Sequence, residues 1–235
     1  MSTVEKYKKI LDSPGVWSLK SSMALALRAA DYYGIAGPSN ARFSALLPGW
    51  PDVLLIHPTD CWADAKAENV IAVNSAGVRL DGVGGVDSKV VAAHFGMHAV
   101  SGRDWVLHVY SHHVVESVAG GINDISDTLA KLSRRGGERT VQNHRYGDAW
   151  FGREAAGNAP SSMGGAELLL LAQSGIGVCA NTLKLAFDDL YHLERSILAN
   201  YLLQASNLEP AVVSGQLSSL LCAQFEAHRS LSLCQ

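Results

Sequence analysis

Short apolar runs of strand length alternate along this chain with stretches of helical spacing, and tight turns join several of the runs. Some neighbouring runs are linked by hairpin turns and others by helices, which excludes both an all-helical bundle and a purely parallel sheet. The pattern predicts an α/β fold, a three-layer α/β/α arrangement with a central, largely antiparallel sheet. The predicted strands cover residues 53–56, 70–73, 78–80, 105–110, 168–172 and 176–179.

Serine, asparagine and glycine mark the expected helix ends. Ser21 and Ser22 are predicted to cap a helix over residues 23–33, and Asn181 and Thr182 a long helix that begins at residue 183. Gly34 is predicted to end the first of these helices, and Gly102 the helix predicted over residues 86–100. Residues 138–165 have no clear period, so we expect an irregular segment there. We expect one domain over residues 1–235, with a helical tail from about residue 210. The other predicted helices cover residues 86–100, 114–119, 122–132 and 217–229.

Composition narrows the class of protein. The 235 residues are 48% hydrophobic and 17% charged, which argues against disorder, and the net charge of -3 argues against a general nucleic-acid binder. No apolar run approaches the roughly 20 residues of a membrane span, and we expect no signal peptide. Four cysteines without a CxxC pair are typical of reduced thiols, so we expect a cytoplasmic protein. From the charge and the absence of an apolar span, we expect neither membrane nor nucleic-acid partners.

Several short motifs, in a fixed order, carry a resemblance to a known family. Residues 39–43 read Ser-Asn-Ala-Arg-Phe, 54–58 Leu-Leu-Ile-His-Pro, 106–111 Val-Leu-His-Val-Tyr-Ser and 170–175 Leu-Leu-Ala-Gln-Ser-Gly. Their order and spacing, from about residue 23 to 203, are similar to the class II aldolase/adducin family. The spacing of Val86 and His94 resembles its adducin-like subgroup.

The resemblance implies a metal site that this chain does not preserve. Family enzymes hold a divalent metal, usually zinc, with a His-x-His pair and the histidine of Asn-His-Gly, and often a glutamate four residues before a helix histidine. The corresponding residues here are His108, Tyr110, Ser174 and Val90, although a register shift of one residue would exchange Val90 for Lys89. One imidazole cannot hold zinc, which needs three or four donors. We therefore predict no metal at this site and no cofactor.

The replaced positions give the predicted catalytic groups. His108 is either an acid or base in a pocket or a core histidine, Tyr110 could donate to a carbonyl, and Ser174 could orient a substrate. Lys89 either stands in for the cation or is a solvated lysine at a helix start. The predicted substrate-binding residues are Asn40, Arg42, His112, His144 and Arg145.

Other polar groups have competing interpretations. His112 and His113 could supply metal ligands beyond the strand, although neighbours on a helix face different ways. His94 and His98, at i and i+4, could chelate a metal, but packing or interhelix hydrogen bonding is the simpler interpretation without an HExxH glutamate. Residues 82–89 resemble a phosphate loop but lack the Gly-Lys-Ser/Thr order. Residues 143–146 either cover a site or form a polar loop.

Two functions fit this pattern. The first is a repurposed, metal-independent lyase, cyclase or isomerase that acts on a small enolisable carbonyl compound in specialised metabolism. The second is a non-catalytic binding or scaffold module, as adducin is on this fold. Tyr110 and Ser174 remain polar, which favours the enzyme, and the family resemblance implies a homo-oligomer, usually a tetramer.

Overall fold

The computed structural model of the chain describes residues 3–35, 41–58, 61–110, 141–143, 168–170, 175–206, 220 and 223–224. Its helices are α1 (Thr3–Leu11), α2 (Pro14–Tyr32), α3 (Ser88–Ser101) and α6 (Leu183–Ser206), with a 3-10 turn η1 at Ala67–Asn69. Its strands are β1 (Arg42–Leu47), β2 (Trp50–Ile56), β3 (Ile71–Asn74), β4 (Arg79–Asp81), β5 (Trp105–Val109), β6 (Val141–Asn143), β7 (Leu168–Leu170) and β8 (Ile176–Ala180).

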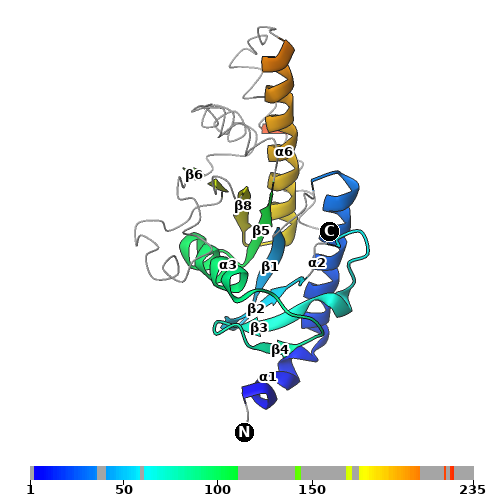
Figure 1. The fold of residues 1–235 in the computed structure, drawn as a ribbon, viewed down its shortest axis with the longest axis vertical. Coiled ribbons are helices and arrows are strands. Elements are labelled where there is room, and N and C mark those ends of the chain that lie inside the picture. The colour runs from blue at the N-terminus through cyan, green and yellow to red at the C-terminus, as the bar shows by residue number, and fades with distance from the viewer. Residues whose placement is uncertain are drawn as a thin grey trace.

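The described strands form one sheet between two helical layers. Their order is β4-β3-β2-β1-β5-β8-β7-β6, and every neighbouring pair is antiparallel except β6 and β7. Figure 1 shows α3 on one side of the sheet and α2 with α6 on the other. The predicted three-layer fold with a largely antiparallel sheet is therefore confirmed.

Alternation along the strands divides the core between the two faces. Phe43, Leu55 and Leu107 belong to the larger apolar cluster, to which α2 and α6 contribute. Leu54 and Ile56 belong to a smaller cluster with Val90 and Val91 of α3. Because successive strand residues point to opposite faces, each central strand contributes to both layers.

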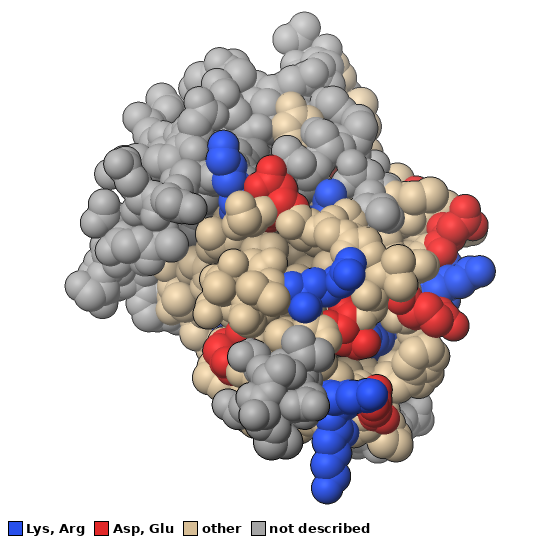
Figure 2. All heavy atoms as spheres, turned by 60° about the horizontal axis from the view of Figure 1, so that its bottom comes forward, with Lys and Arg blue, Asp and Glu red and all other residues tan. Residues whose placement is uncertain are grey.

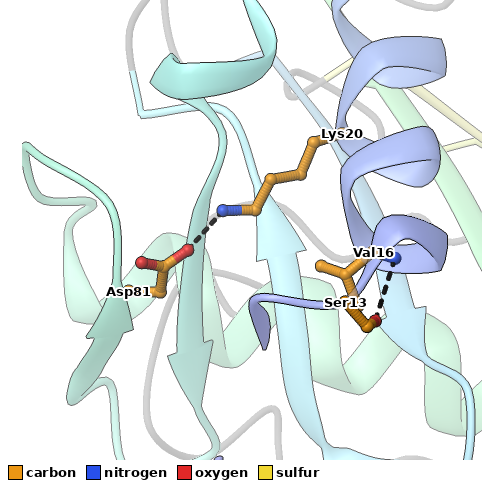
Figure 3. A network of polar contacts seen from close by, with 4 residues as sticks. All are labelled: Ser13, Val16, Lys20 and Asp81. Carbon is orange, nitrogen blue, oxygen red and sulfur yellow. Dashed lines mark hydrogen bonds and ion pairs between the residues drawn. The ribbon is translucent and has the colours of Figure 1, made fainter. Parts of the chain in front are cut away.

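The start of α2 was predicted wrongly. The helix begins at Pro14, and Ser13 caps it by accepting the Val16 N–H at 3.4 Å (Figure 3). Proline suits the first helical position because its missing N–H would have no partner inside the helix. Ser21 and Ser22 therefore lie within the helix rather than at its end.

Three elements were missed and several ends were confirmed. The sequence reading gave neither α1 nor β1, and it placed an irregular segment where β6 runs parallel to β7. Helix α3 ends at Gly102, which has a φ of 63°, and Thr182 accepts the Leu185 N–H at 3.3 Å at the start of α6. The helices predicted over 114–119 and 122–132, and most of the C-terminal helix, lie outside the described residues.

The surface charges and the described helices show how charge and apolar character are distributed. On the face that Figure 2 draws, lysine and arginine are interspersed with aspartate and glutamate, so no field of a single sign covers it. Among the described helices, none combines the length and apolar character of a membrane span.

A partly buried ion pair connects α2 to the edge of the sheet. The ammonium of Lys20 contacts the Oδ2 of Asp81 on β4, and the exposed fractions of the two side chains are 6% and 38% (Figure 3). The lysine is therefore the partner that depends on the pair, since water reaches the carboxylate.

Asp81→Asn is expected to lower the free energy of unfolding by about 2 kcal/mol because it leaves a buried ammonium without its counter-charge. The effect is below the roughly 3–5 kcal/mol of a fully buried pair, because Asp81 is partly screened by water. Lys20→Met is the matched variant and should cost less, since it removes the buried charge. Urea unfolding of both proteins measures the difference, and a larger cost for Lys20→Met would contradict the argument.

Candidate active site

Strands β1 and β5 bring two of the predicted site residues together at the centre of the sheet. Arg42 is the register partner of His108, and Ser44 is the partner of Val106. Arg42 is 8% exposed and His108 is 1% exposed. The cation and the imidazole therefore lie side by side in the interior, which the sequence reading did not derive because it had not recognised β1.

Helix α3 covers this part of the sheet with two histidines. Both are buried, and both contact the hydroxyl of Ser44: His94 through Nδ1 at 2.7 Å and His98 through Nε2 at 2.9 Å. The His94 ring lies 5.8 Å from the His108 ring, measured between centroids. The two helix histidines are packed and hydrogen-bonded as predicted, but the prediction of a partner on another helix was wrong, since Ser44 lies on β1.

The same helix shows where the two candidates for the glutamate position lie. Val90 is buried in the apolar cluster beneath α3, and His94 lies four residues later on the same buried face. Lys89 is exposed in the first turn of the helix. The placement agrees with a solvated lysine at a helix start, and a catalytic role for Lys89 stays a prediction.

Burial keeps the two helix histidines neutral. Burial lowers the pKa of His94 well below its usual range, and the neighbouring His108, His98 and Arg42 add to the effect. Burial lowers the pKa of His98 to about 4, although its hydrogen bond to the Arg103 carbonyl acts in the opposite direction. At neutral pH both rings are therefore uncharged imidazoles that can accept a proton or a hydrogen bond.

The end of β5 lies close against the start of β8. At Gly175, φ is 97°, and a Cβ added there would lie 2.1 Å from the Val109 carbonyl oxygen and 2.9 Å from the Tyr110 Cα. Only glycine permits this approach. The approach brings the start of β8 next to Tyr110, two residues after His108.

The donor set at the family's metal position does not fit zinc. His108 contributes one imidazole, whereas Tyr110 offers a phenol, and a phenol releases its proton only near pH 10 in water. Among the described residues, no group of three His, Cys, Asp or Glu side chains could hold a metal ion. No catalytic step is therefore assigned to a metal here.

The other predicted site residues cannot be placed. Asn40, Ser174, His112, His144 and Arg145, together with His113, lie outside the described residues, so their roles stay predictions. Ser44 was not singled out from the sequence, although the alternation of Arg42, Phe43, Ser44 and Ala45 between polar and apolar residues is the signal of a strand with one polar row.

A separate pocket of about 310 Å³ lies between the end of β2 and the connection from β4 to α3. His57 forms part of its wall and is 1% exposed. The sequence reading used His57 only as part of a motif. The residues that line the pocket are His57, Pro58, Cys61, Asp64, Asn69, Val83, Gly84 and Gly85.

Comparison with known proteins identifies the fold. The chain resembles an aldolase II superfamily protein from Pseudomonas syringae, with a TM-score of 0.73 at 21% identity, over 92% of this chain and 86% of that one. It also resembles YgbL from Escherichia coli, described as a putative aldolase/epimerase/decarboxylase, with a TM-score of 0.63 at 18% identity, over 88% of this chain and 98% of that one.

A sequence relative and a family model extend the comparison. Hybrid PKS-NRPS synthetase 1 from Dothistroma septosporum is 30% identical over 174 residues, a match that covers 68% of this chain and spans only 4% of that protein. The model of the class II aldolase and adducin N-terminal domain matches residues 21–201, which include most of α2, all of the described sheet and most of α6. The adducin-like subgroup stays a prediction. With a match over most of its length and the same layered sheet, the chain belongs to the class II aldolase and adducin N-terminal domain family.

Proposed function

We propose that the chain is a metal-independent enzyme, of the lyase, cyclase or isomerase type, that acts on a small enolisable carbonyl compound. The observation that carries the proposal is the pairing of His108 with Arg42 in the interior. A neutral imidazole can remove a proton from the carbon next to a carbonyl, and a fixed cation stabilises the negative charge that then develops on the oxygen.

The other predicted site residues are proposed to contact the substrate. Tyr110, two residues after His108, is proposed to donate a hydrogen bond to the substrate carbonyl. Asn40, Ser174, His112, His144 and Arg145 are proposed to orient the substrate, and Lys89 to approach it from the start of α3. The buried Val90 stands where the resemblance puts the family's glutamate, and its apolar side chain cannot bind a metal, so the proposed reaction does not use one there.

A role in specialised metabolism is part of the proposal. The relative named as a hybrid PKS-NRPS synthetase supports it. Polyketide-type intermediates carry a methylene between two carbonyl groups, and its protons are acidic enough for an imidazole base. We further propose a cytoplasmic homo-oligomer, a tetramer, in which neighbouring subunits complete the pocket.

Proton exchange tests the reaction without knowledge of the product. Simple β-keto amides and β-keto thioesters are incubated with the purified protein in D₂O, and loss of the α-proton signal is followed by NMR. We expect exchange above the buffer rate, and His108→Gln should reduce it by roughly 10²–10⁴-fold because the base is lost. His192→Gln is the matched control, since His192 lies on α6 and its side chain is 27% exposed.

Two further measurements separate the alternatives. Dialysis against a chelator should leave the exchange rate unchanged, and elemental analysis measures the metal that the protein holds before and after dialysis. Exchange that needs stoichiometric zinc would contradict metal independence. If no carbonyl compound exchanges, and ligand binding is the same in His108→Gln and Tyr110→Phe, the chain is a binding or scaffold module. That module is the second candidate, and the apolar filling at Val90 is the observation that favours it.

A further inference from the structure

The hydroxyl of Ser44 lies between two buried imidazoles on α3. It is 2.7 Å from the Nδ1 of His94 and 2.9 Å from the Nε2 of His98. The other nitrogen of His98, Nδ1, is 2.8 Å from the carbonyl oxygen of Arg103. These contacts form a serine–histidine chain, which runs from the Arg103 carbonyl through His98 and Ser44 to His94.

The direction of each hydrogen bond follows from the carbonyl at one end. A carbonyl oxygen can only accept, so His98 donates from Nδ1–H, and a neutral His98 then has a bare Nε2. The Ser44 hydroxyl therefore donates its single proton to that nitrogen. It can then only accept from His94, which must carry its proton on Nδ1. Both helix histidines are thus fixed in the Nδ1–H tautomer.

The result is a bare nitrogen at the end of the chain. The Nε2 of His94 is buried and has no hydrogen-bond partner among the described residues. A buried acceptor without a partner loses its hydrogen bond to water on folding, so an unpaired one in a folded protein calls for an explanation. The ring that carries this nitrogen is 5.8 Å from the ring of His108, centroid to centroid, with an interplanar angle of 59°.

We propose that His94 is a positioning residue for His108, held by the serine–histidine chain so that the bare Nε2 acts on the neighbouring ring. A lone pair repels the lone pair of another imidazole and attracts an N–H or C–H edge. The chain thereby selects the orientation and tautomer of His108. The inference deepens the proposed function, because it concerns the base named there.

Nitrogen NMR of the protein labelled with ¹⁵N-histidine tests the tautomers directly, without any substrate. At pH 7, His94 and His98 should each show a proton-bearing Nδ1 and a bare Nε2, and the signals are assigned by His94→Gln and His98→Gln. A proton on the Nε2 of His94 would overturn the proposal. The result does not depend on whether the protein is an enzyme.

Substitution of Ser44 tests the effect on His108. Ser44→Ala should release the His94 tautomer and change the ¹⁵N signals of His108, and Ser44→Thr, which keeps the hydroxyl, should restore the wild-type pattern. Ser88→Ala is the control on the same helix, because Ser88 is an exposed serine at the start of α3. If Ser44→Ala does not fold, Ser44→Thr and the wild-type spectra still decide the tautomers.

The outcomes separate the two proposals. His108 signals that stay unchanged while the His94 tautomer changes would overturn the positioning role. The predicted tautomers together with no proton exchange on any carbonyl compound would support the serine–histidine chain and contradict the proposed enzyme. If exchange occurs, Ser44→Ala should lower its rate and move its pH profile, whereas Ser88→Ala should do neither.

Discussion

Gly175→Ala is expected to destabilise the folded chain by about 3 kcal/mol or more, through two separate effects. The residue has a φ of 97°, where an alanine is strained by roughly 1–3 kcal/mol. The added Cβ would also lie 2.1 Å from the Val109 carbonyl oxygen, and neither backbone can give way without breaking the register of β5 and β8. The midpoint of urea unfolding measures the loss.

Gly102→Ala is the matched control for this prediction. It has a φ of 63°, and a Cβ added there meets nothing within 4 Å, so it should cost only about 1 kcal/mol of conformational strain. Equal losses in the two variants would show that the close approach of β8 to β5 contributes nothing. If Gly175→Ala is stable and binds carbonyl compounds as the wild type does, the close approach of Gly175 to β5 has no role in placing Tyr110.

The second large effect is a loss of stability as the pH falls from about 6.5 to about 4. His98 has a pKa of about 4 in the folded chain against 6.5 when exposed, so in this window the unfolded chain binds a proton that the folded chain does not. Unfolding is therefore favoured, by about 3 kcal/mol from His98 alone at the lower limit. His94 adds to the loss, because burial, together with His108, His98 and Arg42, lowers its pKa well below the usual value.

A difference measurement isolates this effect from the titration of carboxylates. Urea unfolding of the wild type and of His98→Gln is compared at pH 7, 6, 5 and 4.5. The variant should be less stable at pH 7, because a glutamine cannot donate to Arg103 and accept from Ser44 as the ring does, and the gap should narrow as the pH falls. A gap of constant size would mean that His98 takes up its proton in the folded chain.

The sequence determined the layered fold because its signals are local. The apolar runs at β2, β3, β5 and β8, together with Gly34, Gly102 and Thr182 at helix ends, act through backbone geometry within a few residues. The order of short motifs was enough for the family, which the match over residues 21–201 confirms. The beginning of α2 was missed because Ser13 and Ser21 are equally good caps in isolation.

The chemistry of the candidate site was decided by contacts that no local pattern contains. His108 meets Arg42 only because β1 pairs with β5, 66 positions apart in the chain by their residue numbers, and β1 had not been recognised. Likewise, whether Lys89 or Val90 faces the sheet depends on the rotation of α3, which packing fixes. The sequence supplied the histidines, the serine and the arginine, and only the tertiary structure, by excluding water around them, made them one hydrogen-bonded and electrostatically coupled group.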